Sequence, residues 1–230
     1  MKKNILIIGG SSGIGLEIVK KLNKEHNIFV ASRTNESLGG LNYQYIKIDV
    51  TKEILDPSIL PDTLDGLVYC PGSINLRPFR GLKPETFIED FNLNVMGAIK
   101  SINAVLKNLN NSQQASIVLF STVAVQTGMP FHSSVAVSKG AIEGLTRSLA
   151  AELAPKISVN AVAPSIVNTP LAEKFLNSES KMERAVDRHP LKKVGSAEEI
   201  SNFTIHLLLN SSWITGQIFG VDGGIGRLKV

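Results

Sequence analysis

The chain has 230 residues, of which 43% are hydrophobic and 19 are glycine, and its 24 Lys and Arg against 20 Asp and Glu give a formal net charge of +4. This length and apolar share are enough for one large domain with a buried core, and they exclude disordered, collagen-like and disulfide-stapled classes of protein. The single cysteine, Cys70, cannot form an internal disulfide and leaves no cysteine cluster for zinc, which is typical of a reducing cytoplasm.

Short apolar runs rich in Ile and Val alternate with longer segments of helical periodicity, which predicts successive βαβ units around a parallel sheet. Most runs are apolar at successive positions, as expected of strands covered on both faces. We therefore predict an α/β fold, one doubly wound domain over 1–230 with about seven strands. The predicted strands are Asn4–Ile8, Ile28–Ser32, Tyr43–Ile48, Leu67–Cys70, Ser116–Phe120, Ser158–Val162 and Gln217–Val221. Connections 33–49 and 49–67 leave room for about one abbreviated helix each, little more than a turn.

The segments between the runs repeat apolar residues at helical spacing. After the first strand, Ile14, Ile18 and Leu22 fall at four-residue steps and predict one face of a helix. Near the C-terminus, Ser196 with Glu199 three residues later forms a capping-box pattern at a helix start. The longer predicted helices cover 84–109, 134–154 and about 197–209. The first opens with Pro84, and the second ends before Pro155.

Charge and hydropathy limit the partners and the location. The apolar run after the first lysines spans only residues 5–8 before glycines intervene, which is too short for a secretory signal. No run reaches the roughly eighteen apolar residues of a membrane span. We therefore expect a cytoplasmic protein without a membrane partner. Lys and Arg are scattered among acidic residues, so we expect an anionic small ligand rather than nucleic acid.

The segment GGSSGIG, residues 9–15, follows the first predicted strand and opens a helix. Glycines let the backbone approach a pyrophosphate, and a helix N-terminus supplies free N–H donors with a partial positive charge. Glycines alone can also mean only a tight turn, but the position between strand and helix favours a phosphate site. The residues of this turn that we expect to bind a cofactor through its pyrophosphate are Gly9, Ser11, Ser12, Gly13 and Ile14.

The second predicted strand ends at Ser32, and Arg33 follows it directly. A dinucleotide fold that binds NAD places a carboxylate here for the ribose 2′-hydroxyl, whereas the 2′-phosphate of NADP requires positive charge. Ser32 and Arg33 therefore favour NADP(H), through an Arg–phosphate contact worth about 1.5–3 kcal/mol. The alternative is a solvated arginine without a ligand.

Several motifs in order along the chain resemble the short-chain dehydrogenase/reductase family. GGSSGIG resembles its TGxxxGxG motif, and LVYCPG at 67–72 stands where the family has LVNNAG. NVMG at 94–97, VAVSKGAIEGLTRSLAAELA, NAVAPSIVNTPL and ITGQIFGVDGG continue the pattern over nearly the whole chain. The resemblance implies a Rossmann-type domain that moves hydride between a nicotinamide and a carbonyl or alcohol. Further cofactor-binding residues that it implies are Asp49, Val50, Cys70, Pro71, Gly72, Pro164, Ile166 and Thr169.

The resemblance also implies a set of catalytic groups. In this family a tyrosine moves the proton, and a lysine four residues later binds the nicotinamide ribose and lowers the phenol pKa. A serine orients the substrate oxygen and an asparagine holds a relay water. Here Lys139 and Asn94 match, and Thr122 stands at the serine position. Val135 stands four residues before Lys139, and the three tyrosines, Tyr43, Tyr45 and Tyr69, all precede the catalytic half. Loss of a positioned acid costs about 10²–10⁴ in rate.

Other groups near the site in sequence could replace the missing phenol. Histidine changes protonation nearest neutral pH, which favours His132, although a loop histidine is the more ordinary interpretation. Cys70 is interpreted as a small packing residue beside the cofactor rather than a nucleophile. The remaining candidate donors are Ser133, Ser134, Thr122 and a water held by Asn94 and Lys139, while His26, His189 and His206 are interpreted as surface or packing residues.

Two functions remain open from the sequence. The first is an NADP(H)-dependent oxidoreductase acting on an unidentified carbonyl or alcohol. The second is a catalytically silent protein that senses NADP(H) or accompanies an active relative, for which Val135 is the main argument. Segment 171–190 is the predicted substrate lid, and 73–79 is expected to line the same pocket. Related proteins pair the helices that correspond to 84–109 and 134–154, so we expect a homo-oligomer, a dimer or tetramer.

Overall fold

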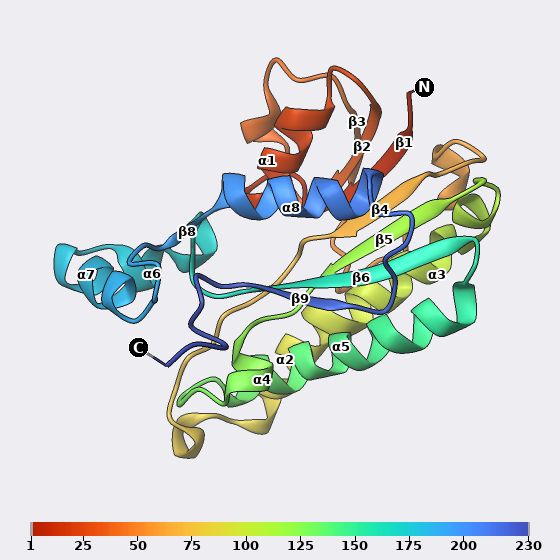
Figure 1. Cartoon of the computed structure of the whole chain (residues 1–230). Coiled ribbons are helices and arrows are strands. Elements are labelled where there is room, and N and C mark those ends of the chain that lie inside the picture. Colours follow the sequence, from red (N-terminus) through yellow and green to blue (C-terminus); the bar gives the residue numbers. More distant parts are fainter. Residues whose placement is uncertain (1, 230) are drawn as a thin grey trace.

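A computed structural model describes residues 2–229, and within them seven parallel strands form one sheet in the order β3-β2-β1-β4-β5-β6-β9. Helices cover both faces of this sheet (Figure 1). The predicted α/β doubly wound fold is therefore confirmed, and each predicted strand overlaps an observed one. The strands are β1 (Asn4–Ile8), β2 (Asn27–Ser32), β3 (Gln44–Lys47), β4 (Gly66–Tyr69), β5 (Ala115–Phe120), β6 (Ile157–Pro164) and β9 (Ile218–Val221).

The helices follow the predicted pattern, with additions around the lid. They are α1 (Gly13–Leu22), α2 (Pro84–Phe91), α3 (Gly97–Asn110), α4 (Ala124–Thr127), α5 (Ser133–Leu153), α6 (Glu173–Leu176), α7 (Glu179–Asp187) and α8 (Ala197–Leu209). The capping box at Ser196 and Glu199 forms as predicted. The two short connections contain single 3-10 turns, at Glu36–Leu38 and Pro57–Ile59. A small sheet of β7 (Val167–Asn168) and β8 (Gly195–Ser196) has no counterpart in the sequence prediction.

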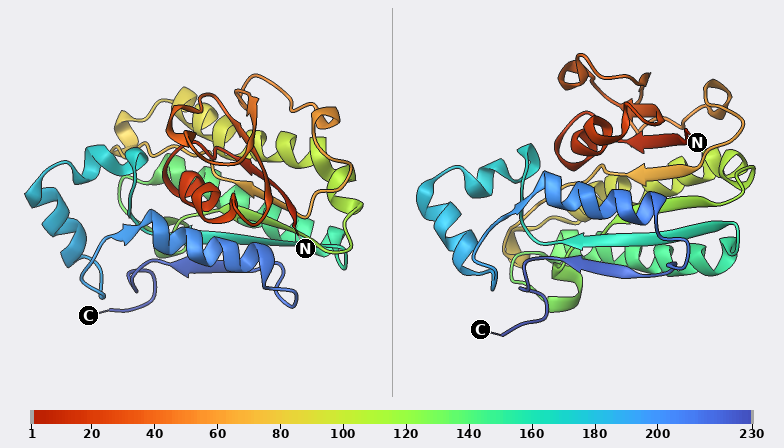
Figure 2. Two further views of the ribbon diagram at one scale, coloured as in Figure 1. Left: turned by 90° about the horizontal axis from the view of Figure 1, so that it is seen from above. Right: turned by 45° about the horizontal axis from the view of Figure 1, so that its top comes forward.

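Each strand of the sheet centre contributes side chains to two cores. Helices α1 and α8 lie on one face and α2, α3 and α5 on the other (Figures 1 and 2). Ile5 and Ile7 of β1 pack in the core under α1 and α8, while Leu6 and Ile8 pack in the core on the opposite face. Each such side chain contributes about 1.5–3 kcal/mol on full burial. Across residues 2–229, no helix combines the length and apolarity needed to cross a membrane.

The predicted long helix over 84–109 is interrupted. A π-helical turn, Asn92–Met96, separates α2 from α3, and the Gly97 N–H donates to the carbonyl of Asn92, five residues earlier. The Tyr69 hydroxyl donates to the Leu93 carbonyl at 2.6 Å. A Cβ at Gly97 would lie 2.1 Å from the Tyr69 oxygen, so only glycine leaves room for this contact. Such π-turns frequently occur at functional sites, and this one carries Asn94.

Gly97→Ala is expected to destabilise the protein by about 1–3 kcal/mol, because the new methyl overlaps the Tyr69 hydroxyl. Gly140→Ala on α5 is the matched control, since its Cβ would meet its nearest neighbour at 3.8 Å. The better helix propensity of alanine should there leave stability equal or up to about 1 kcal/mol higher. Equilibrium urea unfolding measures both. Combining Gly97→Ala with Tyr69→Phe should recover part of the loss, and an absence of recovery would locate the strain elsewhere.

Candidate active site

A cavity of about 1310 Å³ lies at the carboxyl ends of the parallel strands. In open α/β sheets, ligands bind at this edge where the strand order reverses, here between β1 and β4. Its wall includes residues that directly follow β1, β2, β4 and β6, namely Gly9, Arg33, Cys70 and Ser165. Of the catalytic and cofactor-binding residues assigned from the sequence, apart from the substitute proton donors, all except Asn94 line the cavity. The loops after these strands therefore bring the predicted site together.

The glycine turn is built around close backbone approach. Gly9 and Gly13 adopt positive φ values of 75° and 52°. A Cβ at Gly15 would lie 2.4 Å from the Gly9 carbonyl oxygen, so α1 can start here only without a side chain. Ser12 is the N-cap residue of α1, and its side chain makes no capping hydrogen bond. The hydroxyl of Ser12 and the first N–H groups of α1 are thus available to an anion at the cavity wall.

Thr169 brings the late part of the chain against this turn. The position of a Cβ on Gly13 is 3.5 Å from two carbon atoms of the Thr169 side chain. Pro164, Ile166 and Thr169 all line the cavity. The Ile166 carbonyl accepts a hydrogen bond from Gly195 N at 3.3 Å, which joins this loop to the small sheet.

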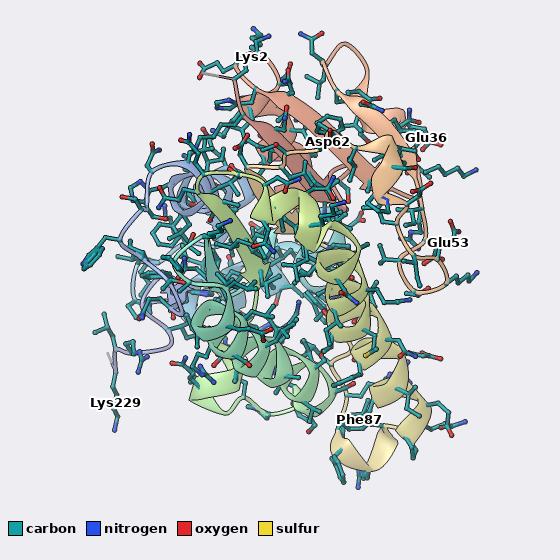
Figure 3. The ribbon with its side chains drawn as sticks, turned by 90° about the vertical axis from the view of Figure 1, so that its right-hand side faces the viewer. Lys2, Glu36, Glu53, Asp62, Phe87 and Lys229 are labelled. Atoms are coloured by element: carbon teal, nitrogen blue, oxygen red, sulfur yellow. The ribbon has the colours of Figure 1, made fainter. Side chains whose placement is uncertain are left out.

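At the other end of the cavity, Ser32 and Arg33 lie beside Asp49. Hydrogen bonds from the Thr51 hydroxyl and N–H lower the pKa of the Asp49 carboxyl, with smaller effects from Lys52 and Arg33. Among the residues of the described chain that line the cavity, Asp49 is the only one with a carboxylate side chain. Glu36 and Glu53 project outward from the loops after β2 and β3 (Figure 3). Arg33 is exposed, and a cation at this place suits an additional phosphate.

Asn94 is fully buried, with one free acceptor. Its amide nitrogen donates to the Ser73 hydroxyl at 2.9 Å and to the Asp90 carbonyl at 2.8 Å. Within residues 2–229 its oxygen, Oδ1, has no hydrogen-bond partner. A Cβ on Gly72 would lie 3.3 Å from this oxygen and 3.6 Å from Lys139 Nζ. The unpaired oxygen and the Lys139 ammonium therefore lie beside the same point, which fits a bound water.

A buried carboxylate behind the cavity holds this arrangement. Asp90 is 1% exposed and accepts hydrogen bonds from Ser73 Oγ at 2.5 Å, Asn75 Nδ2 at 2.7 Å and Ser134 Oγ at 2.5 Å. Sequence analysis missed Asp90, because these partners come from distant segments. The sequence did offer one signal for Asp90, namely its position four residues before Asn94 in a predicted helix.

Burial controls the charge of two groups beside the cavity. Desolvation lowers the pKa of Lys139 to about 8, although the neighbouring Cys70 and Asp90 act in the opposite direction. Desolvation also raises the pKa of the Cys70 thiol to about 12, and the nearby Lys139 charge does not offset it. Cys70 is therefore a protonated thiol at neutral pH, which agrees with a packing role. Lys139 is mostly charged there, which suits binding of hydroxyl or phosphate oxygens.

The structure separates the proposed substitutes for the phenol. Val135 and Lys139 line the cavity from α5, Thr122 lines it from the segment after β5, and His132 lines it from the residue before α5. The Thr122 hydroxyl donates to the Pro164 carbonyl at 3.4 Å, and the His132 Nδ1 lies 2.7 Å from the Pro130 carbonyl. In the described chain, Ser133 and Ser134 are not part of the cavity wall, and Ser134 donates to Asp90.

His189 was interpreted from the sequence as a surface or packing residue, and its 3% exposure agrees with packing. The structure adds that it lines the cavity, which the sequence did not indicate. Its Nδ1 lies 2.6 Å from the Ala185 carbonyl and its Nε2 lies 2.8 Å from Ser165 Oγ. Sequence spacing did not show this pair, because Ser165 and His189 are 24 residues apart. His206, by contrast, is exposed and stacks on Phe203.

The predicted lid forms two short helices, α6 and α7, that extend beyond one end of the sheet (Figures 1 and 2). Its side chains reach the cavity, and four of them are cationic: Lys174, Lys181, Arg184 and Arg188. None of the four forms a salt bridge within residues 2–229. The same part of the chain holds no group of three His, Cys, Asp or Glu side chains suited to a metal ion.

Comparison with known proteins places this chain in a family. The model of the family described as Enoyl-(Acyl carrier protein) reductase matches residues 9–226. The chain therefore belongs to this family of short-chain dehydrogenase/reductase oxidoreductases. The sequence resemblance is confirmed at this level.

Relatives and solved structures match nearly the whole chain. L-xylulose reductase of Caenorhabditis elegans is 32% identical, over 98% of this chain and 96% of the relative. The 3-oxoacyl-(acyl-carrier-protein) reductase FabG of Thermotoga maritima is 31% identical, over 97% of each chain. The structure of ElxO with NADP bound matches with a TM-score of 0.86 at 26% identity, covering 98% of this chain and 99% of ElxO.

The buried charge of Lys139 predicts a pH-dependent stability difference. Because its pKa falls from 10.5 to about 8 on folding, the folded protein binds fewer protons than the unfolded chain between these values. The burial cost is fully present below about pH 8 and fades as the pH rises toward 10.5. Lys139→Met should therefore be more stable than wild type by about 1–3 kcal/mol at pH 7, with a smaller gap at pH 10.

Urea unfolding at the two pH values measures this gap. Lys107→Met is the control, because Lys107 is an exposed residue of α3. Its difference from wild type should stay constant with pH. A constant gap for Lys139→Met as well would show that the ammonium is not desolvated in the folded protein.

Proposed function

We propose that this chain is an NADP(H)-dependent oxidoreductase that transfers hydride between the nicotinamide and a carbonyl or alcohol substrate. The observation that carries the proposal is one cavity that joins the glycine turn at α1 to Lys139. The reductase names of two relatives support the reaction class, and NADP in ElxO supports the cofactor. These names favour the enzyme over the silent binder left open by the sequence.

The residues present fit the cofactor. A Cβ at Gly9 would meet Pro71 at 3.0 Å, so glycine lets Pro71 pack directly on the turn, and both residues line the cavity. Ser11, Ser12 and the N-terminus of α1 would hold the pyrophosphate. Ser32 and Arg33 would hold the 2′-phosphate, and Asp49 with Val50 would border the adenine. Pro164, Ile166 and Thr169 would border the nicotinamide.

The chemistry follows from the polar groups near that end. NADPH, when bound, supplies the hydride. Lys139 would bind the ribose hydroxyls, and its positive charge would stabilise negative charge on the substrate oxygen. Thr122 would orient that oxygen through its hydroxyl. The unpaired Asn94 Oδ1 would hold a water between itself and Lys139, in reach of solvent protons.

Val135 means that the proton comes from a group other than a phenol at this position. Val135 is 5% exposed and lines the cavity on the same helix as Lys139. A tyrosine shares a helix face with the lysine when it stands four residues before it. In this chain that position is the apolar Val135. We therefore propose an atypical site in which charge and proton come from different elements.

The lid and the outer helices define the remaining proposals. The cationic side chains of 171–190 favour an anionic group on the substrate, since they have no carboxylate partner within residues 2–229. Helices α2, α3 and α5 cover the same sheet face (Figure 1). Exposed apolar side chains there, Ile88 and Val137, support assembly of a homo-oligomer through this layer.

Arg33→Ala is expected to weaken NADPH binding about ten- to hundredfold, because one charge-assisted phosphate contact is worth about 1.5–3 kcal/mol. NADH binding should not change. Fluorescence titration of both cofactors measures the effect, with Arg80→Ala as control, since Arg80 is exposed and outside the cavity wall of the described chain. Tighter binding of NADH than NADPH by the wild type would contradict the role of Arg33.

The enzymatic proposal is tested by NADPH oxidation with 9,10-phenanthrenequinone and a panel of ketones. Wild type should turn over at least one of them, and Lys139→Met should be slower by about 10²-fold or more. NADPH titration of both proteins separates lost binding from lost chemistry. If wild type binds NADPH but only Val135→Tyr turns over, the protein is a silent binder and the proposed activity is wrong.

A further inference from the structure

Ser165 and His189 form a hydrogen-bonded pair in the cavity wall that the reaction described above does not use. His189 Nε2 and Ser165 Oγ are 2.8 Å apart, and His189 Nδ1 is 2.6 Å from the Ala185 carbonyl. A carbonyl only accepts hydrogen bonds, so Nδ1 carries a proton. In the neutral ring Nε2 is then the acceptor, and the Ser165 hydroxyl donates to it.

The ring is held in this orientation by its surroundings. His189 is 3% exposed, and a Cβ on Gly223 would lie 3.2 Å from its Cδ2 atom, so the imidazole packs directly on glycine. A hydroxyl bonded to an imidazole that a third group orients is the arrangement by which proteins move a proton through serine. Such an arrangement needs a substrate within reach of the hydroxyl.

The position of Ser165 meets this need. The carbonyl of Pro164, which begins the peptide bond into Ser165, accepts hydrogen bonds from Thr122 Oγ1 at 3.4 Å and from Val123 N at 3.1 Å. The peptide that leads into Ser165 therefore contacts Thr122, the residue proposed to orient the substrate oxygen. Ser165 is half-exposed, and it lines the cavity together with Thr122, Val135 and Lys139.

We propose that Ser165 is a catalytic residue that exchanges the proton with the substrate oxygen, and that His189 supplies and removes this proton. The proposal rests on the oxidoreductase function proposed above. In reduction, the Ser165 hydroxyl gives its proton to the carbonyl oxygen as hydride from NADPH reaches the carbonyl carbon. Protonated His189 passes its Nε2 proton to Ser165 Oγ. The products are the alcohol, NADP⁺ and neutral His189, which solvent reprotonates, and oxidation runs the same steps in reverse.

The alternative side chains are less well placed for this role. The Thr122 hydroxyl is bonded to the Pro164 carbonyl and the Ala124 N–H, neither of which can resupply a proton. Ser134 donates to the buried Asp90, and it lies outside the cavity wall of residues 2–229. His132 lines the cavity, but the structure pairs its ring only with the Pro130 carbonyl among described residues, with no hydroxyl between ring and substrate. Ser165 is the hydroxyl at the cavity that is bonded to an imidazole.

The test uses Ser165→Ala and Ser165→Thr with 9,10-phenanthrenequinone as the probe, alongside NADPH titration and circular dichroism. Ser165→Ala should lower kcat about 10²–10⁴-fold, with KM for the probe and NADPH affinity within about threefold of wild type. Ser165→Thr keeps a hydroxyl and should keep most of the activity. Ser133→Ala is the matched control, because Ser133 is not part of the cavity wall of the described chain.

A second variant separates proton transfer from structural damage. Val135→Tyr combined with Ser165→Ala should regain at least about tenfold in kcat over Ser165→Ala alone, because a phenol near Lys139 offers another proton source. His189→Gln, which keeps a polar side chain but cannot relay a proton, should resemble Ser165→Ala in kcat and should be rescued in the same way.

Three results would overturn the proposal. A kcat for Ser165→Ala within twofold of wild type, with NADPH binding intact, would refute the pair while leaving the oxidoreductase function standing. Parallel losses of kcat and NADPH affinity without rescue by Val135→Tyr would show that the pair only anchors the lid. Absence of turnover by wild type that still binds NADPH would refute the proposed function, and the proton role with it.

Discussion

The close approach of α1 to the turn after β1 is the constraint on which the rest of the site depends. A side chain at Gly15 would overlap the Gly9 carbonyl, so the helix can begin directly at the cavity only because the position is glycine. This brings the free N–H groups of the first helical turn to the carboxyl edge of the sheet, where they and the helix dipole favour an anion. The same use of glycine recurs at Gly97, where the missing side chain admits the Tyr69 hydroxyl and allows the π-turn. Backbone proximity thus shapes both the part of the cavity proposed to hold phosphate and the helix that carries Asn94.

A second constraint is the direction, from donor to acceptor, of the buried hydrogen bonds behind the cavity. The Asp90 carboxylate accepts hydrogen bonds from three side chains, so the Ser73 hydroxyl must donate to it. Ser73 therefore uses its oxygen to accept from the amide nitrogen of Asn94. Because the second N–H of that amide bonds the Asp90 carbonyl, Asn94 Oδ1 is left as the only free group, beside Lys139. One buried acid thus fixes which end of the asparagine faces the reaction, which links the packing of α2 to the chemistry of α5.

The sequence predicted the parts of this protein that rest on local patterns. Apolar runs located the seven strands of the sheet, and Ser196 with Glu199 located the start of α8, because burial on both faces and capping both act over a few residues. The glycine turn, Arg33 and Lys139 lie at one cavity, since parallel strands end at a common edge, and their roles toward a cofactor stay predictions. The π-turn was not predicted, because it depends on the Tyr69 hydroxyl from a different strand. Asp90 and His189 were missed for the same reason: their roles come from partners 15–44 residues away, which no spacing rule connects.

Val135 stands where the resemblance to this family places a tyrosine, so the proposed function assigns proton transfer and charge stabilisation to side chains on different elements. Lys139 keeps its positive charge at neutral pH even though burial lowers its pKa to about 8, so it can hold a ribose and stabilise an oxyanion. It is a poor net source of protons, because giving one up would remove the charge that the same step requires. A separate donor resolves this conflict. Ser165, bonded to a buried imidazole and carried by the loop after β6, approaches the cavity from a different element than α5. Under this proposal Ser165 supplies the proton while Lys139 stays positively charged.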